Sequence, residues 1–481
     1  MRKERNIGVY LFVFFLALAL ATPVALAAEE YKITYKELEA YKKFLDDPRP
    51  LWKDFDIKTV IPPEDYAKMT YDVEAMKKVW AEVIGFRTPD VVGKIAPEIK
   101  PGTYTYKDKE KYPGLKELMI PALYENWFKP GEKPLAGNFP EVKVIPTRQY
   151  YLALPIAKAT KKNIGTTKLN DQGYILPRSY AGGIPFPRPE GEFKAQQIIY
   201  NWEKRYFGGD NYYGFGTFQG FNKHFKPDVL MVAERYVLRL QGRALMEPYG
   251  WYDERAEKRG ELDSVVLKFL SPRDMYGSAQ AVIHYIEPTH YDAALMYLSG
   301  MRRIRKMSTT DTQDAVAGQD AIYDDNQGFA QKLSPKIYPY KYELIGEREY
   351  LVPFATTEAP GYLSSQGLEL RNYEFERRPT YVVKLTQLDS NYVYGQRILY
   401  IDKETFLLYY IENYDQKGRL YRSALTIAPL FRPDMGLFFE NDVLFRDHLD
   451  LHSTFGRALV FPVTWLNRSH VDLGSMISKG K

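Results

Sequence analysis

The clearest pattern of apolar and polar positions lies in residues 379–427. Four runs rich in Tyr, Val, Ile, Leu and Phe, each of strand length, alternate there with polar clusters that favour turns. These clusters are residues 389–391, 402–404 and 415–418. The first run places Tyr381, Val383 and Leu385 on one face, whereas the next two runs are apolar on both faces. The pattern predicts an antiparallel meander whose middle strands are covered on both sides.

A sheet covered on both sides needs a layer of helices or loops over its concave face, and such a layer can enclose a hydrophobic cavity. A filled core is the alternative, because most buried sheets hold no ligand. If a cavity exists, we expect it to be lined by apolar side chains of the meander and by the tryptophan of a predicted helix at residues 192–206. These residues are Tyr381, Val383, Leu385, Ile398, Tyr400, Phe406, Leu408 and Trp202.

Helical periodicity is strongest in the first third of the chain. Acidic residues open an apolar stripe that continues to Ile84, which predicts a helix over residues 64–84, and a second helix is predicted over residues 114–128. Strand-like runs recur beyond residue 229. The glycines of GFGTFQGF, residues 214–221, predict strand and turn structure rather than a phosphate-binding loop, because no periodic helix follows them.

Residues 1–27 have the three parts of a secretory signal peptide. A basic start is followed by an apolar run at residues 7–21 and by the cleavage motif A-x-A at residues 25–27. We expect cleavage to leave Ala28 as the first residue of the mature chain. An uncleaved anchor helix is the alternative, but the apolar run is shorter than the ~20 residues that a membrane span needs.

The composition narrows the possible chemistry. The chain contains no cysteine, which excludes disulfides, thiol catalysis, cysteine-ligated metals and a lipid-modified cysteine. A formal net charge of +5 over 481 residues gives no global preference for nucleic acid or for an anionic membrane. Tyrosine is frequent, at 40 residues, and suits both strands and the mouths of ligand cavities.

Two charged segments follow one another in the middle of the chain. A basic cluster ends one predicted strand, and its members are Arg302, Arg303, Arg305 and Lys306. It could bind a phosphate or carboxylate group or an acidic partner, with a solvated sheet edge as the alternative. The polar stretch at residues 308–327 contains several aspartates without the spacing of a calcium loop. It predicts a mobile acidic loop that could pair with the basic cluster.

The best candidates for metal binding or catalysis are His448, Asp450 and His452. On a strand all three would point to one side, but the outer histidines would lie about 13 Å apart, so one ion could bind only a neighbouring pair. The polar face of a half-buried strand is the alternative. We expect His284 and His290 to be structural, because a proline ends the strand between them. The chain has neither a G-x-S-x-G elbow nor an H-E-x-x-H motif, so we expect no enzyme.

Five motifs stand out in a fixed order along the chain. They are AGGIPFP at residues 181–187, NWEKRYFGG at 201–209, YLSGMRRIRKM at 297–307, YKYELIGEREYLVP at 340–353 and the meander. Together they resemble an exported bacterial family of unknown function in the superfamily of periplasmic lipoprotein carriers (LolA/LolB-like). The resemblance implies an α+β fold in which a curved antiparallel sheet, or half-barrel, wraps around helices. We place the half-barrel at residues 141–481 and a partly helical cap or wrap at residues 28–140.

The resemblance also implies a function, by fold analogy alone. It is that of a periplasmic protein that binds or carries a lipid or another hydrophobic ligand near the outer membrane, without a cofactor. One alternative is a structural or accessory partner of an envelope transporter or outer-membrane protein. The other is an exported metal-dependent hydrolase that uses residues 448–452. We expect no nucleic-acid partner, and no membrane-spanning segment once residues 1–27 are removed.

Overall fold

The computed structural model describes most of the chain beyond residue 62. The described ranges are 63–130, 138–206, 208–307, 312–316, 319–354, 361–364, 367–370, 374–427, 431–437 and 442–476. All of them belong to one compact unit, residues 42–481. The predicted signal peptide, residues 1–27, lies outside the described residues.

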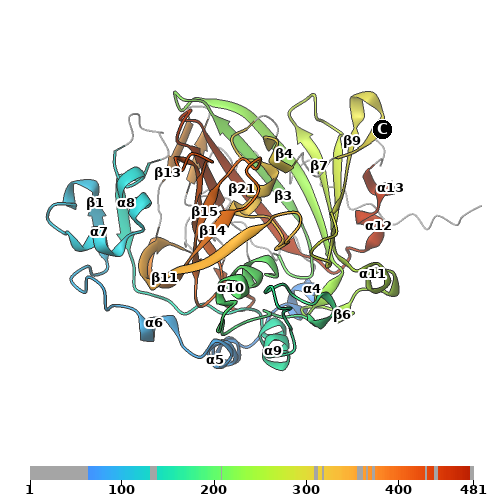
Figure 1. Ribbon diagram of the computed structural model, residues 1–481, viewed down its shortest axis with the longest axis horizontal. Coiled ribbons are helices and arrows are strands. Elements are labelled where there is room, and N and C mark those ends of the chain that lie inside the picture. Colours follow the sequence, from blue (N-terminus) through green and yellow to red (C-terminus); the bar gives the residue numbers. More distant parts are fainter. Residues whose placement is uncertain are drawn as a thin grey trace, which may run out of the picture. The chain divides into compact units, whose positions relative to one another are not determined.

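A 15-stranded sheet forms the body of this unit (Figure 1). Its strands are β1 (Gly102–Thr105), β2 (Glu141–Val144), β3 (Asn211–Phe221), β4 (Pro227–Arg239), β7 (Glu261–Ser271), β8 (Ala279–Tyr285), β9 (Ala293–Leu298), β10 (Arg303–Lys306), β11 (Tyr340–Pro353), β14 (Glu374–Gln387), β15 (Gln396–Asp402), β16 (Leu408–Tyr414), β17 (Leu420–Ile427), β20 (Asp442–Asp447) and β21 (Ser453–Pro462). Three short pairs lie outside it: β5 (Gln241–Arg243) with β6 (Gly250–Trp251), β12 (Gly361–Ser364) with β13 (Gly367–Leu370), and β18 (Phe431–Arg432) with β19 (Gly436–Leu437).

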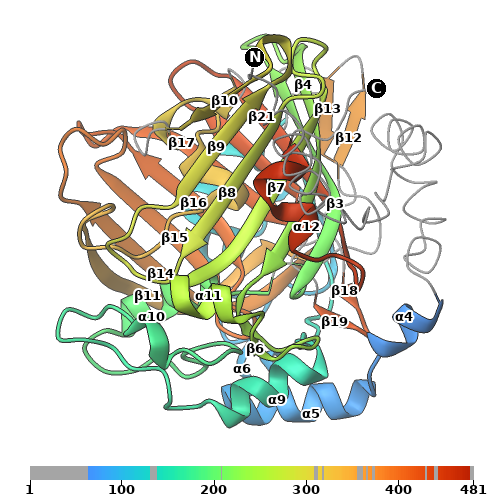
Figure 2. The same cartoon turned by 90° about the vertical axis from the view of Figure 1, so that its right-hand side faces the viewer.

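The strand order shows that the sheet is antiparallel and open. In space the order is β1-β2-β14-β15-β16-β17-β20-β21-β3-β4-β7-β8-β9-β10, and β11 pairs with β14. The pairing of β2 with β14 is parallel, and the other pairings in this order are antiparallel. Among the described strands, none joins β1 to β10, and Figure 2 shows how strongly the strands curve. The predicted curved antiparallel sheet is confirmed.

The predicted meander is confirmed as β14 to β17. Each of its turns uses a polar side chain to bind the backbone, which is why the clusters of polar residues mark them. Asp402 accepts hydrogen bonds from the backbone amides of Glu404 and Thr405 at 2.9 and 2.6 Å. Asp415 accepts from the amides of Lys417 and Arg419, both at 2.9 Å. The middle strands, β15 and β16, are buried along most of their length, as their apolar pattern predicts.

The helices are short and lie around the sheet (Figures 1 and 2). They are α4 (Pro63–Lys68), α5 (Val73–Ile84), α6 (Thr88–Val91), α7 (Gly114–Leu118), α8 (Pro121–Asn126), α9 (Leu154–Lys162), α10 (Lys194–Glu203), α11 (Glu254–Arg259), α12 (Arg468–Val471) and α13 (Leu473–Met476). In the described part of the chain, no helix combines the length and apolar character needed to cross a bilayer.

Two of the predicted helices are each divided into two. The helix expected over residues 64–84 becomes α4 and α5, because Asp72 caps the start of α5 by accepting from the amide of Ala75 at 2.6 Å. The helix expected over residues 114–128 becomes α7 and α8, because Pro121 begins a new helix. The third, α10, lies within its predicted range.

The amino-terminal elements are built into the sheet. β1 pairs with β2, so strand pairing crosses the predicted domain boundary at residue 140. Glu404, in the turn between β15 and β16, binds three separate amino-terminal segments. Its carbonyl accepts from Trp80 Nε1 at 2.9 Å, and its carboxylate accepts from the amides of Thr88 and Tyr150 at 3.0 and 2.9 Å. The described part of the cap therefore shares one core with the half-barrel.

Candidate functional site

A cavity of about 360 Å³ lies against one half of the sheet. Its wall is formed by β3, β4, β7, β8 and β9, and its other side is formed largely by residues 323–338, which we call the cover. Pairing between strands places the wall residues on one face: Phe218 opposite Met231, and Val265 opposite Val282. Apolar side chains from strands that follow one another in the chain thus bound the cavity on this side.

Gly216 leaves part of this wall open. It lies on β3 opposite Ala233 of β4, and both residues line the cavity. A Cβ atom added to Gly216 would meet no described heavy atom within 4 Å, and the backbone there does not require glycine. The absence of a side chain at this position therefore contributes to the volume of the cavity.

Two ion pairs lie at the polar end of the cavity. Asp263 Oδ1 lies 2.5 Å from His284 Nδ1, and Lys332 Nζ lies 2.7 Å from Asp292 Oδ1. The side chains of Asp263 and His284 remain 26% and 38% exposed because they face the cavity. Burial alone would lower the pKa of His284, but the charge of Asp263 and its hydrogen bond raise that pKa to about 9. The imidazole is therefore a cation at neutral pH.

Two arginines also line the cavity. Arg235 projects from β4, with its guanidinium carbon 5.4 Å from the centre of the Tyr212 ring. Arg205 follows the end of α10 and stacks on Trp202 at 3.6 Å from the ring centre. Its Nη1 donates to the carbonyl of Trp202 at 2.6 Å, and its Nη2 donates to Gln327 Oε1 in the cover.

The cover is fastened by two buried aspartates. Asp324 accepts from the hydroxyls of Tyr338 and Tyr392 at 2.7 and 2.6 Å, and burial raises its pKa. Asp325 accepts from the Tyr394 hydroxyl at 2.6 Å and forms an ion pair with Arg397 at 2.8 Å. These contacts tie the cover to β15 and to the loop before it.

The predicted pairing of the acidic loop with the basic cluster is wrong for Asp324 and Asp325. Asp324 and Asp325 are only 3% and 1% exposed, and they bind tyrosines and an arginine of the core rather than the basic cluster. Residues 308–311 and 317–318 lie outside the described residues.

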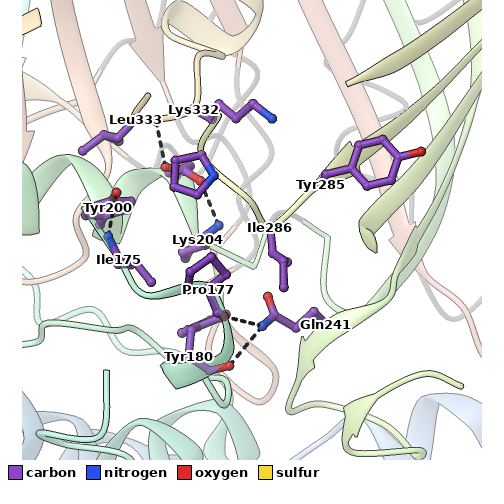
Figure 3. Close-up of a pocket in the computed structure, with 12 residues that line it drawn as sticks. Ile175, Pro177, Tyr180, Tyr200, Lys204, Gln241, Tyr285, Ile286, Lys332 and Leu333 are labelled. Atoms are coloured by element: carbon purple, nitrogen blue, oxygen red, sulfur yellow. Dashed lines mark hydrogen bonds and ion pairs between the residues drawn. The ribbon is translucent and has the colours of Figure 1, made fainter. Parts of the chain in front are cut away.

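A second, much smaller pocket of about 10 Å³ lies beside the cavity and shares Glu203, Tyr285 and Lys332 with it (Figure 3). It has room for about one water molecule.

The eight residues predicted to line a cavity lie elsewhere. Seven of them are buried and the eighth, Ile398, is partly buried; none of the eight lines the cavity described above. The cover packs directly onto the meander: a Cβ atom on Gly328 would lie 2.9 Å from Leu408 Cδ2. Trp202 is close to the cavity but behind it, supporting Arg205 and donating from Nε1 to the carbonyl of Phe329 at 2.8 Å. The cavity described above is therefore walled by the half of the sheet that does not contain the meander.

The basic cluster lies at the free edge of the sheet. Arg303, Arg305 and Lys306 belong to β10, the last strand in the order, and Arg302 precedes it; all four are exposed. Among the described residues, none of the four forms an ion pair with an acidic side chain. This position favours the alternative of a solvated sheet edge, because charged residues on an edge strand discourage pairing with other chains.

The strand predicted through residues 448–452 is wrong. β20 ends at Asp447 and β21 begins at Ser453, so the three candidate ligands lie in the turn between them and do not alternate. His448 Nε2 lies 2.8 Å from Ser423 Oγ, and burial lowers its pKa to about 4. His452 lies 3.5 Å from Asp320, while Asp450 is exposed. The described residues contain no cluster of three or more side chains suited to hold a metal ion.

Sequence reasoning missed the residues that make this cavity. The strand over GFGTFQGF is confirmed as β3, but the role of Gly216 depends on its neighbour Ala233 on β4. His284, expected to be structural, forms the ion pair with Asp263 at the polar end. The register between strands places Gly216 beside Ala233 and His284 beside Asp263. This register cannot be inferred from the residues of one strand alone.

Comparison with known proteins places the chain among uncharacterised relatives. It is 22% identical over 316 residues to an uncharacterised protein of Pseudomonas aeruginosa, and the match covers 63% of this chain and 66% of that one. Similar solved structures include a putative outer membrane lipoprotein-sorting protein domain from Vibrio parahaemolyticus, with 14% identity, a TM-score of 0.41, and coverage of 59% of this chain and 98% of that one. Others are a DUF1329 family protein from Desulfovibrio piger (14%, TM-score 0.38, covering 56% and 92%) and a LolA superfamily protein from Nitrosomonas europaea (12%, TM-score 0.37, covering 58% and 98%).

The family itself is defined by a match over more than half of the chain. Residues 121–454 match the family described as "Protein of unknown function (DUF1329)". This range contains β2 to β20, and with them the meander and the residues that line the cavity except Gly456. The family of unknown function expected from the sequence motifs is confirmed: the chain belongs to the DUF1329 family.

Proposed function

We propose that this protein binds a lipid or another hydrophobic ligand in the cavity between β3–β9 and the cover, and that it acts without catalysing a reaction. The observation that carries the proposal is the cavity itself. At about 360 Å³ it falls within the roughly 300–1,000 Å³ of small-molecule sites, and Phe218, Met231 and Val265 give it an apolar wall. A cavity of this size between the sheet and the cover leaves apolar side chains without packing partners unless a ligand fills it.

A carrier must also admit and release its ligand. Tyr291 lines the cavity and is 41% exposed, so the cavity reaches the protein surface beside it. We propose that the ligand passes there and that the protein carries it through the periplasm near the outer membrane. Support for the periplasm comes from residues 1–27, which have the pattern of a secretory signal peptide.

Mass spectrometry tests this function directly. The chain would be purified from a bacterial periplasm without detergent, and its mass measured under native and then denaturing conditions, with organic extraction of the same sample. The proposal predicts a stoichiometric added mass that disappears on denaturation, together with a lipid or other hydrophobic molecule in the extract. An unmodified native mass that added lipids also leave unchanged would contradict it.

A further inference from the structure

Two arginines line the cavity together with four carboxylates, those of Glu203, Asp263, Asp292 and Asp324. Arg205 and Arg235 line the cavity, and Arg239 lies close enough that both Arg235 and Arg239 act on Arg205 as like charges. Burial lowers the pKa of Arg205 to about 9, and the two neighbouring charges act in the same direction. Arg205 nevertheless remains a cation at neutral pH. Arg239 is paired with Asp210 at 3.9 Å, but the two neighbouring arginines in the lining still favour the binding of an anion in a partly buried site.

The nearby carboxylates are already engaged by other groups. Asp263 is bound to His284, and Asp210 accepts from three backbone amides, the shortest of these bonds being 2.7 Å. Glu203 binds Lys204 at 2.8 Å and accepts from the amide of Leu333 at 3.2 Å. The negative groups at this end of the cavity therefore have partners of their own.

Arg205 itself keeps unused hydrogen-bonding capacity. Its described hydrogen bonds are to the carbonyl of Trp202 and the amide oxygen of Gln327, and none is to a carboxylate. Its Nε is buried and has no hydrogen-bond partner in the described part of the chain. A buried guanidinium N–H without an acceptor is costly, and a ligand oxygen would remove that cost.

We infer that the cavity takes an amphiphile with a single acyl chain and an anionic head, either a carboxylate or a phosphate, with the head at Arg205 and Arg235 and the chain along Ala233, Met231 and Phe218. This inference rests on the proposed function and adds the class and orientation of the ligand. The volume of about 360 Å³ lies near the lower end of the range for ligand sites, which suits one chain better than several.

Binding of ligands that share one acyl chain tests the inference. Isothermal titration calorimetry below the micelle concentration would compare palmitate and palmitoyl lysophosphatidate with the uncharged palmitoyl glycerol and the cationic hexadecyltrimethylammonium. We expect either or both anionic ligands to bind at least about tenfold more tightly than the uncharged one, and the stronger of the two identifies the head group. Equal binding of all four, or preference for the cation, would overturn the inference while leaving the proposed function standing.

Variants locate the head group. Arg205→Gln and Arg235→Gln should each weaken binding of the anionic ligand about tenfold and leave palmitoyl glycerol binding unchanged, which also shows that the cavity is intact. Arg303→Gln, on the exposed edge strand β10, is the matched control and should change neither. Unchanged anion binding in both cavity variants would overturn the inference. If neither palmitate nor palmitoyl glycerol binds the unaltered chain, the proposed function fails as well.

Discussion

Arg378 Nη2 lies 2.8 Å from Glu404 Oε2 in the interior of the protein, and neither side chain is exposed to solvent. The same guanidinium binds Asp402 through Nε at 2.9 Å. Glu404 in turn binds the amides of Thr88 and Tyr150, so the pair joins β14, the turn after β15 and two amino-terminal segments. The cost of removing this ion pair from water is offset because nearly all of its polar atoms form hydrogen bonds or ion pairs inside the protein.

Removing one charge from this pair should be strongly destabilising. Glu404→Gln keeps the shape of the side chain but leaves the buried Arg378 short of negative charge, and we expect a loss of about 3 kcal/mol in the free energy of unfolding. Urea denaturation measures it. Glu343→Gln is the matched control, because Glu343 pairs with Lys341 at 3.0 Å on the exposed surface and should contribute less than about 1 kcal/mol. Similar losses of unfolding free energy in the two variants would show that the buried pair stabilises the protein no more than an exposed pair does.

Filling the cavity should abolish ligand binding without unfolding the protein. Gly216→Phe places a ring in the open space of the cavity wall, on a strand that favours aromatic residues, so we expect unchanged or higher stability and loss of the bound hydrophobic molecule. Extraction and mass spectrometry of the purified variant measure the loss.

Gly300→Phe is the control for this change. Gly300 is exposed, and a Cβ atom there also meets no described heavy atom within 4 Å, but it lies outside the cavity. The control should retain the ligand. Full ligand content in Gly216→Phe would place the binding site elsewhere.

The cover should loosen when its buried aspartate is changed. Asp325→Asn removes the charge that pairs with Arg397 and weakens the bond from Tyr394, so amide hydrogen exchange should accelerate in the cover, residues 323–338. We expect a loss of about 2–3 kcal/mol in stability. Asp314→Asn, at an exposed position just before the cover, should leave exchange unchanged. Equal protection in both variants would mean that Asp325 does not fasten the cover.

The ion pair between Asp263 and His284 should make stability depend on pH in a defined direction. The pKa of His284 is raised to about 9, so its contribution is complete below about pH 6.5 and is lost as the pH rises through about 9. Burial tends to raise the pKa of Asp263, but His284 lowers it, so that contribution is present above about pH 4 and is lost in more acidic solution. The pair should therefore stabilise the protein most between about pH 4 and 6.5.

A double-mutant cycle with Asp263→Asn and His284→Gln measures this coupling. We expect about 1 kcal/mol at pH 5.5, because the His284 side chain is more than a third exposed and solvent screens the pair. The coupling should vanish near pH 10. A coupling energy that is the same at both pH values would contradict the assignment of a charged pair.

The meander could be predicted from sequence because its information is local. Strand periodicity and turn residues such as Asp402 and Asp415 act within a few positions of one another, and the structure places β14 to β17 where they indicate. The alternating His, Asp and Leu residues at 448–452 predict a strand, but such a pattern fits a turn equally well. The bonds of Leu449 and Asp450 amides to Asp447 Oδ1, at 2.8 and 2.9 Å, instead make a tight turn there.

The cavity could not be predicted because it depends on register and on distant partners. Gly216, Ala233 and Val265 line one cavity only after three strands have paired. The charges of Asp324 and Asp325 indicate a solvated loop. Their burial could not be predicted, because the tyrosine hydroxyls that bind them come from beyond residue 337. The strongly apolar pattern of the meander predicts burial, but it does not distinguish the wall of a cavity from a closely packed core.

One measurement tests the central claim most directly: a crystal structure of the chain with a bromine-labelled single-chain lipid, in which the bromine is located by its anomalous signal. The account predicts a peak inside the cavity, beside Phe218, Met231 and Val265 and within the space left by Gly216. A peak against the meander core or on the outer surface, with the cavity empty at saturating lipid, would contradict it.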